Sequence, residues 1–314
     1  MFGLLAPVFS LVVLGYVIGR SSYLSNAASQ VLAEFGFKVA MPALLFRAAS
    51  SFPPLPASPV SLLVAYFGAC IVVWLVATLV TTVALNRPRS DAPAVAMASC
   101  FGNTVMLGVP LSITAFGAEA AAPLAILISV DTPLLWLVAN VHAEWSLRRG
   151  TGASWSTIRT VLQDLAGNPI VMSVVLGLSW RLTGLGLQAE LDRLIALLAQ
   201  AAVPTALFAL GLTLSKFQIR GEGATVAAIA SLKLLLFPIL VGLFAYLLSL
   251  PPAWAGVALV CAAMPTGANA YLFAVKYDRA VGSVSGAVLI TTALAWFTLM
   301  LLFGALSSEG FRPS

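Results

Sequence analysis

Apolar segments long enough to cross a bilayer follow one another from residue 4 to residue 306, separated by short polar or proline-containing breaks. A membrane-spanning helix needs roughly 20 such residues, whereas the strands of a membrane barrel are shorter and alternate in polarity. Charged residues make up only 9% of the chain, compared with about 25% in an ordinary soluble domain. We therefore predict an all-α integral membrane protein embedded in the lipid bilayer. Residues 4–20 are expected to be a retained first span, not a cleaved signal peptide.

Breaks rich in glycine, proline and polar residues divide the chain into ten predicted helices. They lie at residues 20–23, 51–59, 86–91, 117–119, 146–167, 183–190, 216–223, 251–252 and 277–282. Ten Lys or Arg residues fall in the odd-numbered loops, and four fall on the other side of the predicted membrane. Because positive loops stay in the cytoplasm, we expect both termini on the outer side of a plasma (inner) membrane. The net charge of +5 then marks orientation, and no nucleic-acid partner is predicted.

The sequence repeats itself when it is shifted by 162 residues, which is the signature of a duplicated fold. The shift aligns residues 7–15 with 169–177, residues 42–46 with 204–208, and residues 125–129 with 287–291. Prolines and a glycine coincide in these segments, and they are more informative than matching Leu and Val residues. Since each copy holds five spans, the second copy enters the membrane from the opposite side. An inverted repeat of this kind is typical of secondary transporters that alternate between inward-open and outward-open states.

Two stretches in matching positions of the two copies are expected to interrupt predicted helices 4 and 9. Residues 103–110 begin with Asn and Thr and end with Pro, and we expect the helix to unwind over this stretch. Residues 265–271 follow the same logic. Freed backbone groups are not tolerated facing lipid, so each break should line a cavity or meet the other break, with helix N-termini suited to a carboxylate. The predicted substrate-binding residues are Asn103, Thr104, Gly108, Pro110, Pro265, Thr266, Gly267, Asn269 and Tyr271.

The two interrupted stretches resemble the auxin efflux carrier family. Asn103-Thr104 with Gly108 and Pro110 matches its N-T-x-x-x-G-x-P motif, and Pro265-x-Gly267 followed by Phe273-Ala274 and Tyr277 matches its second motif. The resemblance covers residues 1–306 and implies the crossed-helix fold of bile-acid symporters and sodium/proton antiporters. It also implies that the crossing of helices 4 and 9 binds the carboxylate of the substrate.

The same resemblance implies a division into a scaffold and a moving transport domain. Scaffold helices 1–2 would occupy residues 1–50 and helices 6–7 residues 168–214, while transport-domain helices 3–5 would occupy 58–145 and helices 8–10 residues 222–306, with a cytoplasmic loop at 146–167. Relatives in the family often pair through scaffold helices, so a homodimer is expected. Asn269 departs from the apolar residue of plant members, and the long central loop of plant carriers is absent. A small organic anion such as malonate or malate is therefore favoured over an indole auxin.

Charged residues inside predicted spans are costly and usually have a partner. Asp131 lies in the middle of helix 5 and Lys233 in the middle of helix 8, so they are candidates for an ion pair that a proton or sodium ion disrupts during transport, or for a static pair. Lys38 and Arg47 in helix 2 are both candidates for attracting an anion, and both have snorkelling to an interface as the alternative.

Three other functional classes are alternatives to an organic-anion carrier. An ion-coupled symporter or antiporter of the bile-acid type would use Asp131, and a membrane receptor would bind a solute without moving it. An enzyme is disfavoured because the chain has no G-x-S-x-G or H-E-x-x-H motif and has a single histidine.

Cys70, Cys100 and Cys261 lie in apolar runs at unrelated spacings, so neither a disulfide framework nor a metal site is predicted. No cofactor is predicted.

Overall fold

The computed structural model describes residues 2–21, 23–25, 27–50, 58–147, 167, 169–217 and 222–308. The predicted cytoplasmic loop at 146–167 lies almost entirely outside this described part of the chain. Everything described is helical or a short connection, apart from one isolated backbone bridge that is taken up below.

The first half of the chain runs from α1 to α7, with short π-helical or 3₁₀ pieces (η) inserted between α-helices. In order these elements are α1 (Phe2–Arg20), α2 (Ala28–Phe35), η1 (Gly36–Ala40), α3 (Met41–Ser50), α4 (Pro59–Leu79), η2 (Val80–Ala84), η3 (Arg89–Asp91), α5 (Ala92–Cys100), η4 (Thr104–Gly108), α6 (Val109–Phe116), η5 (Gly117–Ala120) and α7 (Ala121–Ser146).

The second half of the chain runs from α9 to α15. Its elements are α9 (Pro169–Leu182), α10 (Ala189–Leu214), α11 (Gly223–Ser231), η6 (Leu232–Leu236), α12 (Phe237–Leu247), α13 (Pro252–Ala263), α14 (Ala268–Tyr277) and α15 (Val281–Ser308).

Five continuous helical stretches of the described chain are long and apolar enough to cross a membrane. They are Pro59–Ala84, Thr104–Ser146, Ala189–Leu214, Gly223–Leu247 and Val281–Gly304. The 43 residues of Thr104–Ser146 would extend about 65 Å as one straight helix, twice the thickness of a bilayer core. Gly117 adopts a positive φ of 57° between α6 and α7, a conformation that glycine allows at little cost, and the helix ends there. The five long apolar stretches make the chain a multi-pass membrane protein.

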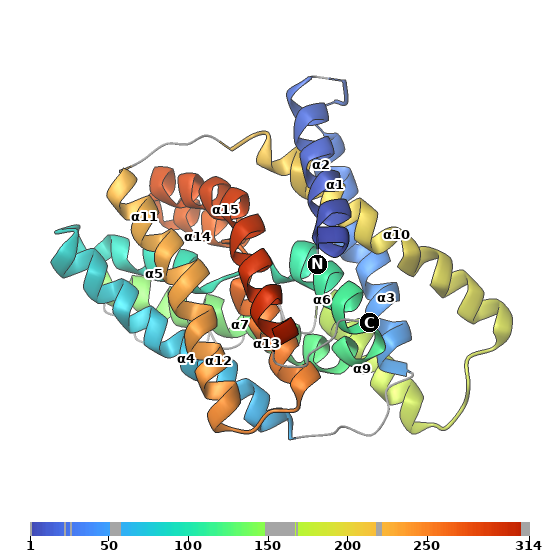
Figure 1. Ribbon diagram of the computed structural model, residues 1–314. Helices are drawn as coiled ribbons and strands as arrows, with labels where there is room; N and C mark the ends of the chain where they lie inside the picture. The colour runs from blue at the N-terminus through green and yellow to red at the C-terminus, as the bar shows by residue number, and fades with distance from the viewer. Residues whose placement is uncertain are drawn as a thin grey trace.

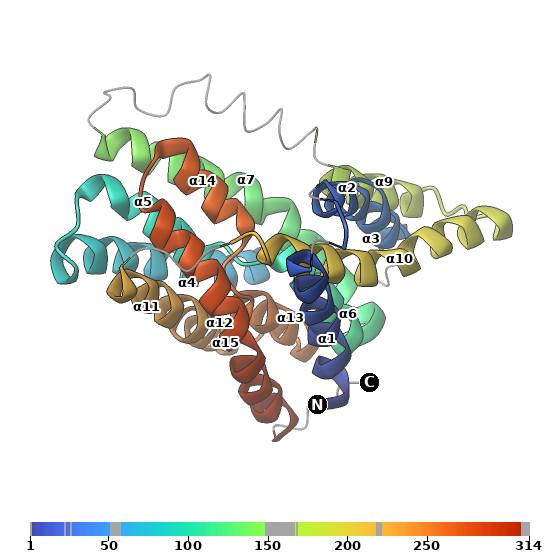
Figure 2. The same cartoon turned by 90° about the horizontal axis from the view of Figure 1, so that it is seen from above.

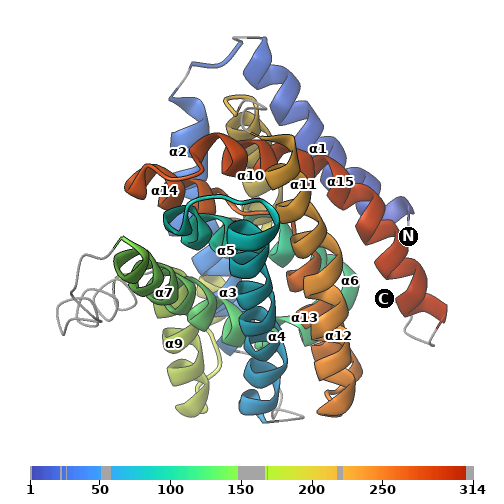
Figure 3. The same ribbon diagram turned by 90° about the vertical axis from the view of Figure 1, so that its left-hand side faces the viewer.

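The helices pack in two groups, which Figures 1 and 2 show side by side. In one group α1, α2 and α3 pack around the long helix α10, and α9 packs against α3. In the other group α4 packs against α5 and α12, and α11 and α14 pack against α15. Figure 3 shows α4 and α12 running alongside each other in this second group, and α1 beside α15 at the boundary with the first.

The first group contains the same close packing contact twice. Gly15 of α1 has no room for a side chain because the backbone of Phe208 and Gly211 in α10 lies against it. Gly177 of α9 meets α3 in the same manner, with a Cβ there falling 2.7 Å from both Phe46 O and the Ala49 methyl. The residues of the two contacts are 162 positions apart in the sequence: Gly15 pairs with Gly177, Phe46 with Phe208, and Ala49 with Gly211. The sequence repeat therefore coincides with a repeated three-dimensional contact.

Candidate functional site

Two of the places where the chain leaves the helical conformation are hydrogen-bonded to each other. The first, residues 101–103, separates α5 from η4, and the second, residues 264–267, separates α13 from α14. Gly102 and Thr266 form an antiparallel backbone bridge. The amide of Asn103 donates to the carbonyl of Pro265 at 2.8 Å, and the amide of Gly267 donates to the carbonyl of Phe101 at 3.0 Å. Each break therefore supplies partners for backbone groups that the other has freed.

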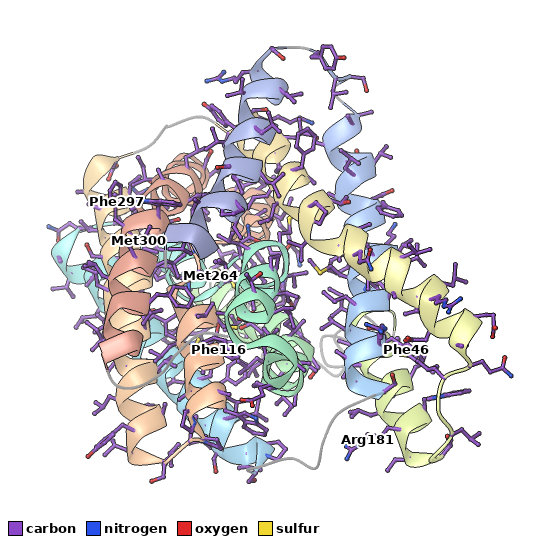
Figure 4. All side chains as sticks on the ribbon, turned by 45° about the vertical axis from the view of Figure 1, so that its right-hand side comes forward. Phe46, Phe116, Arg181, Met264, Phe297 and Met300 are labelled. Carbon is purple, nitrogen blue, oxygen red and sulfur yellow. The ribbon has the colours of Figure 1, made fainter. Side chains whose placement is uncertain are left out.

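Glycines allow the two backbones to approach this closely. A Cβ on Gly267 would lie 2.9 Å from both Gly102 O and Phe101 Cδ1, and a Cβ on Gly102 would lie 3.3 Å from the Cβ of Met264. Figure 4 shows Met264 in the middle of the molecule, between the two helix groups and beside α6. Gly108 also faces Met264, whose Cγ would lie 3.1 Å from a Cβ there. A side chain at Gly267 would therefore push the two breaks apart.

The first break is shorter than the sequence suggested. We expected unwinding over residues 103–110, but the non-helical segment covers residues 101–103, η4 follows as a π-helical turn, and α6 begins at Val109. Pro110 lies at the N-terminal end of α6, where a helix tolerates proline because an amide there is not needed for an intrahelical hydrogen bond. The wider π turn before it makes room for the proline ring, so Pro110 does not break the helix.

The threonines at corresponding positions of the two breaks have different environments. Thr266, 1% exposed, donates two hydrogen bonds: its amide donates to Thr291 Oγ1 at 3.0 Å and its hydroxyl donates to the Ala98 carbonyl at 2.9 Å. Thr104 is also buried, but its hydroxyl has no partner in the described structure. It lies against the hydroxyl of Tyr66 in α4, which is likewise unpartnered.

A cavity of about 630 Å³ opens beside the second break. Ala268, the first residue of α14, lines it together with Tyr271, which packs edge-on against Phe217 with ring centroids 4.9 Å apart. Asn269 is half-buried in the same first turn of α14. Because the first amides of a helix have no intrahelical acceptors and carry the positive end of the helix dipole, this end of α14 favours an anion.

A second cavity of about 660 Å³ lies between α1, α10 and α15, and Phe217 lines both cavities. Its walls are largely apolar, with Phe9 and Trp296 in edge-to-face contact at 5.2 Å. Arg20 and Tyr16 line it as well, and Arg20 Nε donates to the Tyr16 hydroxyl at 3.4 Å. The boundary between the two helix groups is therefore hollow on both sides of Phe217.

Asp131 and Lys233 are both buried but do not form the direct ion pair that we considered. Lys233 Nζ donates to the Ala262 carbonyl at 2.7 Å and lies 4.6 Å from the centre of the Phe237 ring. No carboxylate oxygen lies within ion-pair distance of it in the described chain, and Asp131 Oδ1 has no hydrogen-bond partner there. The Lys233 ammonium lies directly beside the crossing, 3.2 Å from where a Cβ of Gly102 would be.

The two cations proposed for anion attraction have other partners. Lys38 is exposed and lies 3.6 Å from the carboxylate of Glu34, one helical turn away. Arg47 holds Asp192 of α10 with two hydrogen bonds, at 2.7 and 3.1 Å. Arg47 thus joins α3 to α10, and the structure does not bring Lys38 together with the crossing.

Several residues of the crossing are not among the predicted site residues. Gly102 belongs to the glycine and proline cluster that predicts the first break, but nothing in the spacing of Gly102 or Met264 shows that they face the other break. Thr291 is recognisable only through the repeat, which aligns it with Ser129. Tyr66 is a polar side chain within an otherwise apolar span, and that signal was available.

A family profile and several curated proteins are similar to the chain. The profile described as "Membrane transport protein" matches residues 1–303. A Rhizobium meliloti protein named "Putative malonate transporter" is 28% identical over 98% of both chains. An "Uncharacterized transporter" of Methanothermobacter thermautotrophicus is 25% identical over 94% of both chains. "Auxin efflux carrier component 5" of Arabidopsis thaliana is 24% identical over 65% of this chain and 67% of its own length. The resemblance to auxin efflux carriers is thereby confirmed.

Proposed function

Because the chain belongs to the membrane transport protein family, which includes the auxin efflux carriers, we propose that it carries a small organic anion across the membrane. The substrate binds where the two helix breaks cross. The hydrogen-bonded bridge between Gly102 and Thr266, with a cavity beside it, is the observation on which this proposal depends most.

The electrostatics of the crossing favour an anion. Two features supply positive potential there: the N-terminal amides of α14, beside the cavity of about 630 Å³, and the ammonium of Lys233, next to Gly102. Both act in a low-dielectric interior, where they are stronger than in water. Asn103, Asn269 and Tyr271 supply polar groups for the rest of the ligand. The name of the Rhizobium relative makes malonate the first anion to test.

Movement of the substrate is proposed to follow an elevator mechanism within an inverted repeat of ten spans. The repeated contact of Gly15 and Gly177 supports two structurally equivalent halves, and the group of α1, α2, α3, α9 and α10 supports a scaffold. The remaining helices, with the crossing, would form the moving domain. The hollow boundary between the groups leaves room for one to slide along the other. In this arrangement both termini lie on the outer side of the inner membrane, and a homodimer through the scaffold stays a prediction.

Flux and binding together test the proposal. The purified protein in proteoliposomes should exchange internal for external radiolabelled malonate, and malonate should raise its melting temperature, since a ligand that binds the folded state stabilises it. Asn103→Ala should lose both effects. Gln188→Ala, which removes an exposed amide before α10, should keep both. Binding without exchange would indicate a receptor, and stabilisation by malonate that persists in Asn103→Ala would exclude the crossing as the site.

A further inference from the structure

A group of polar side chains lies buried in the apolar interior directly behind the crossing. Tyr66 is 1% exposed, Thr104 4%, Asp131 3% and Lys233 0%. Buried polar atoms in native proteins nearly always have a hydrogen-bond partner, so each exception needs an explanation. Within the described chain, the Tyr66 hydroxyl, Thr104 Oγ1 and Asp131 Oδ1 are all exceptions. The Tyr66 and Thr104 hydroxyls lie against each other, so Asp131 Oδ1 is the buried oxygen that most needs an explanation.

Asp131 lacks the partner that would keep its carboxylate ionised. The ammonium of Lys233 acts on it electrostatically, but that ammonium donates to the Ala262 carbonyl and lies over the ring of Phe237. The other ionisable groups that act on Asp131 are Tyr66 and Cys70 from α4 and Cys261 from α13. None of these is a second cation. A carboxylic acid in such a place is neutral unless a charge or a donor comes close.

The sequence repeat shows that neither break needs both charges. The shift of 162 residues aligns Asp131 and Tyr66 of the first copy with Ala293 and Ala228 of the second, and Lys233 of the second copy with Ile71 of the first. The second copy forms its break without a carboxylate or a tyrosine at these positions, and the amide and hydroxyl of its threonine, Thr266, are both hydrogen-bonded. A carboxylate at the position of Asp131 is therefore not a common requirement of the two breaks, which indicates a role for Asp131 beyond folding.

We propose that Asp131 takes up and releases one proton in each transport cycle, and this inference rests on the proposed function. Thr104 connects the proton to the anion, because it follows Asn103 of the crossing and its hydroxyl lies against Tyr66. Protonation removes the buried negative charge of Asp131, whose Oδ1 has no hydrogen-bond donor to stabilise it in the described chain. A proton moved together with the anion also cancels one negative charge of the load crossing the membrane. The O–H bond of the Asp131 carboxyl is the only covalent bond of the protein that forms and breaks in this cycle.

The wild-type protein provides the first test. Proteoliposomes contain a pH-sensitive dye, the membrane voltage is clamped with potassium and valinomycin, and no sodium is present. Addition of external malonate should acidify the lumen as labelled malonate enters, and an imposed gradient, acidic outside, should concentrate malonate inside at least about tenfold. Malonate entry without lumenal acidification would overturn the proposal, as would accumulation that follows a sodium gradient and ignores the pH gradient.

Variants test whether Asp131 is the responsible group. Asp131→Asn should still exchange internal for external malonate at equal pH but lose the gradient-driven accumulation, and Asp131→Glu should retain it. Asp192→Asn, which removes a carboxylate of the scaffold, is the matched control and should accumulate malonate as the wild type does. Gradient-driven accumulation in Asp131→Asn equal to that of the wild type would refute the assignment. If the wild type neither binds nor exchanges malonate, the proposed function itself fails, and that result is distinct from a loss of coupling.

Discussion

At the scale of single residues, the crossing depends on glycines, which have no Cβ, and on hydrogen bonds that differ between two equivalent threonines. Gly267 leaves no room for a Cβ and Gly102 leaves little, so the backbones of the two breaks touch directly. Thr104 and Thr266 occupy the same position in the two copies, yet only the Thr266 hydroxyl has a partner in the described structure. Substitutions at these residues should separate packing from function.

Gly267→Ala should weaken the protein and its transport. The added methyl group would meet Gly102 O and Phe101 Cδ1 at 2.9 Å, and overpacking of this kind costs about 1–3 kcal/mol. We expect a lower melting temperature in detergent and at least about tenfold slower malonate exchange. Gly186→Ala, where a Cβ has nothing within 4 Å, is the control and should change neither. Normal exchange by Gly267→Ala would mean that the breaks do not have to touch.

The two threonines should respond oppositely to substitution by valine. Thr266→Val removes the hydrogen bond to the Ala98 carbonyl and leaves a buried acceptor unpaired, which costs about 1–3 kcal/mol. Thr104→Val removes a hydroxyl without a partner, so the melting temperature should stay the same or rise. Malonate-driven acidification should nevertheless fall in Thr104→Val. Equal destabilisation of the two variants, measured by thermal unfolding, would contradict the assigned hydrogen bonding.

At the scale of elements, helix pairs α1 with α10 and α3 with α9 are two copies of one contact. The glycine of each pair lies against the backbone of its partner helix, and short interhelical distances of this kind are a common way to pack membrane helices. Sequence reasoning found the repeat from its prolines and glycines. It did not find that these glycines pack against the segment around Phe46 or Phe208, because the shift relates positions along the chain and does not reveal which helices touch.

Gly15→Ala and Gly177→Ala should therefore destabilise the protein to a similar degree. Each substitution forces two backbones apart, with an expected cost of about 1–3 kcal/mol. Gly304→Ala is the opposite control: a Cβ there meets nothing within 4 Å, and alanine favours a helix over glycine by about 1 kcal/mol. Thermal unfolding of the three variants should show two decreases and one small increase. A decrease confined to Gly15→Ala would argue against equivalent halves.

At the scale of the whole molecule, the all-helical membrane class and the family could be predicted from the sequence, because apolar length and the proline and glycine motifs are local signals. The extent of the first break could not be, since the π-helical turn that accommodates Pro110 depends on what packs around it. The relation between Asp131 and Lys233 was also missed. Two buried charges suggest a pair, but the position of the Ala262 carbonyl decides where the ammonium goes.

A cross-link between the two helix groups should stop transport. Phe9 of α1 and Trp296 of α15 touch across their boundary, with ring centroids 5.2 Å apart. Cysteines at these two positions, joined by a short bifunctional reagent, should abolish malonate exchange, and a cleavable reagent should restore it on reduction. Trp136 and Phe273, in contact within the second group at 5.7 Å, provide the control pair. Full exchange by the protein cross-linked between residues 9 and 296 would exclude a sliding motion.

The location of a bound anion tests the crossing most directly, and electron cryo-microscopy of the purified protein with saturating malonate can reveal it. Density for the ligand should lie beside residues 101–103 and 264–267, within hydrogen-bonding distance of the first amides of α14. That density should vanish in Asn103→Ala prepared in the same way. Ligand density elsewhere in the wild-type protein, with the crossing unoccupied, would contradict the assignment.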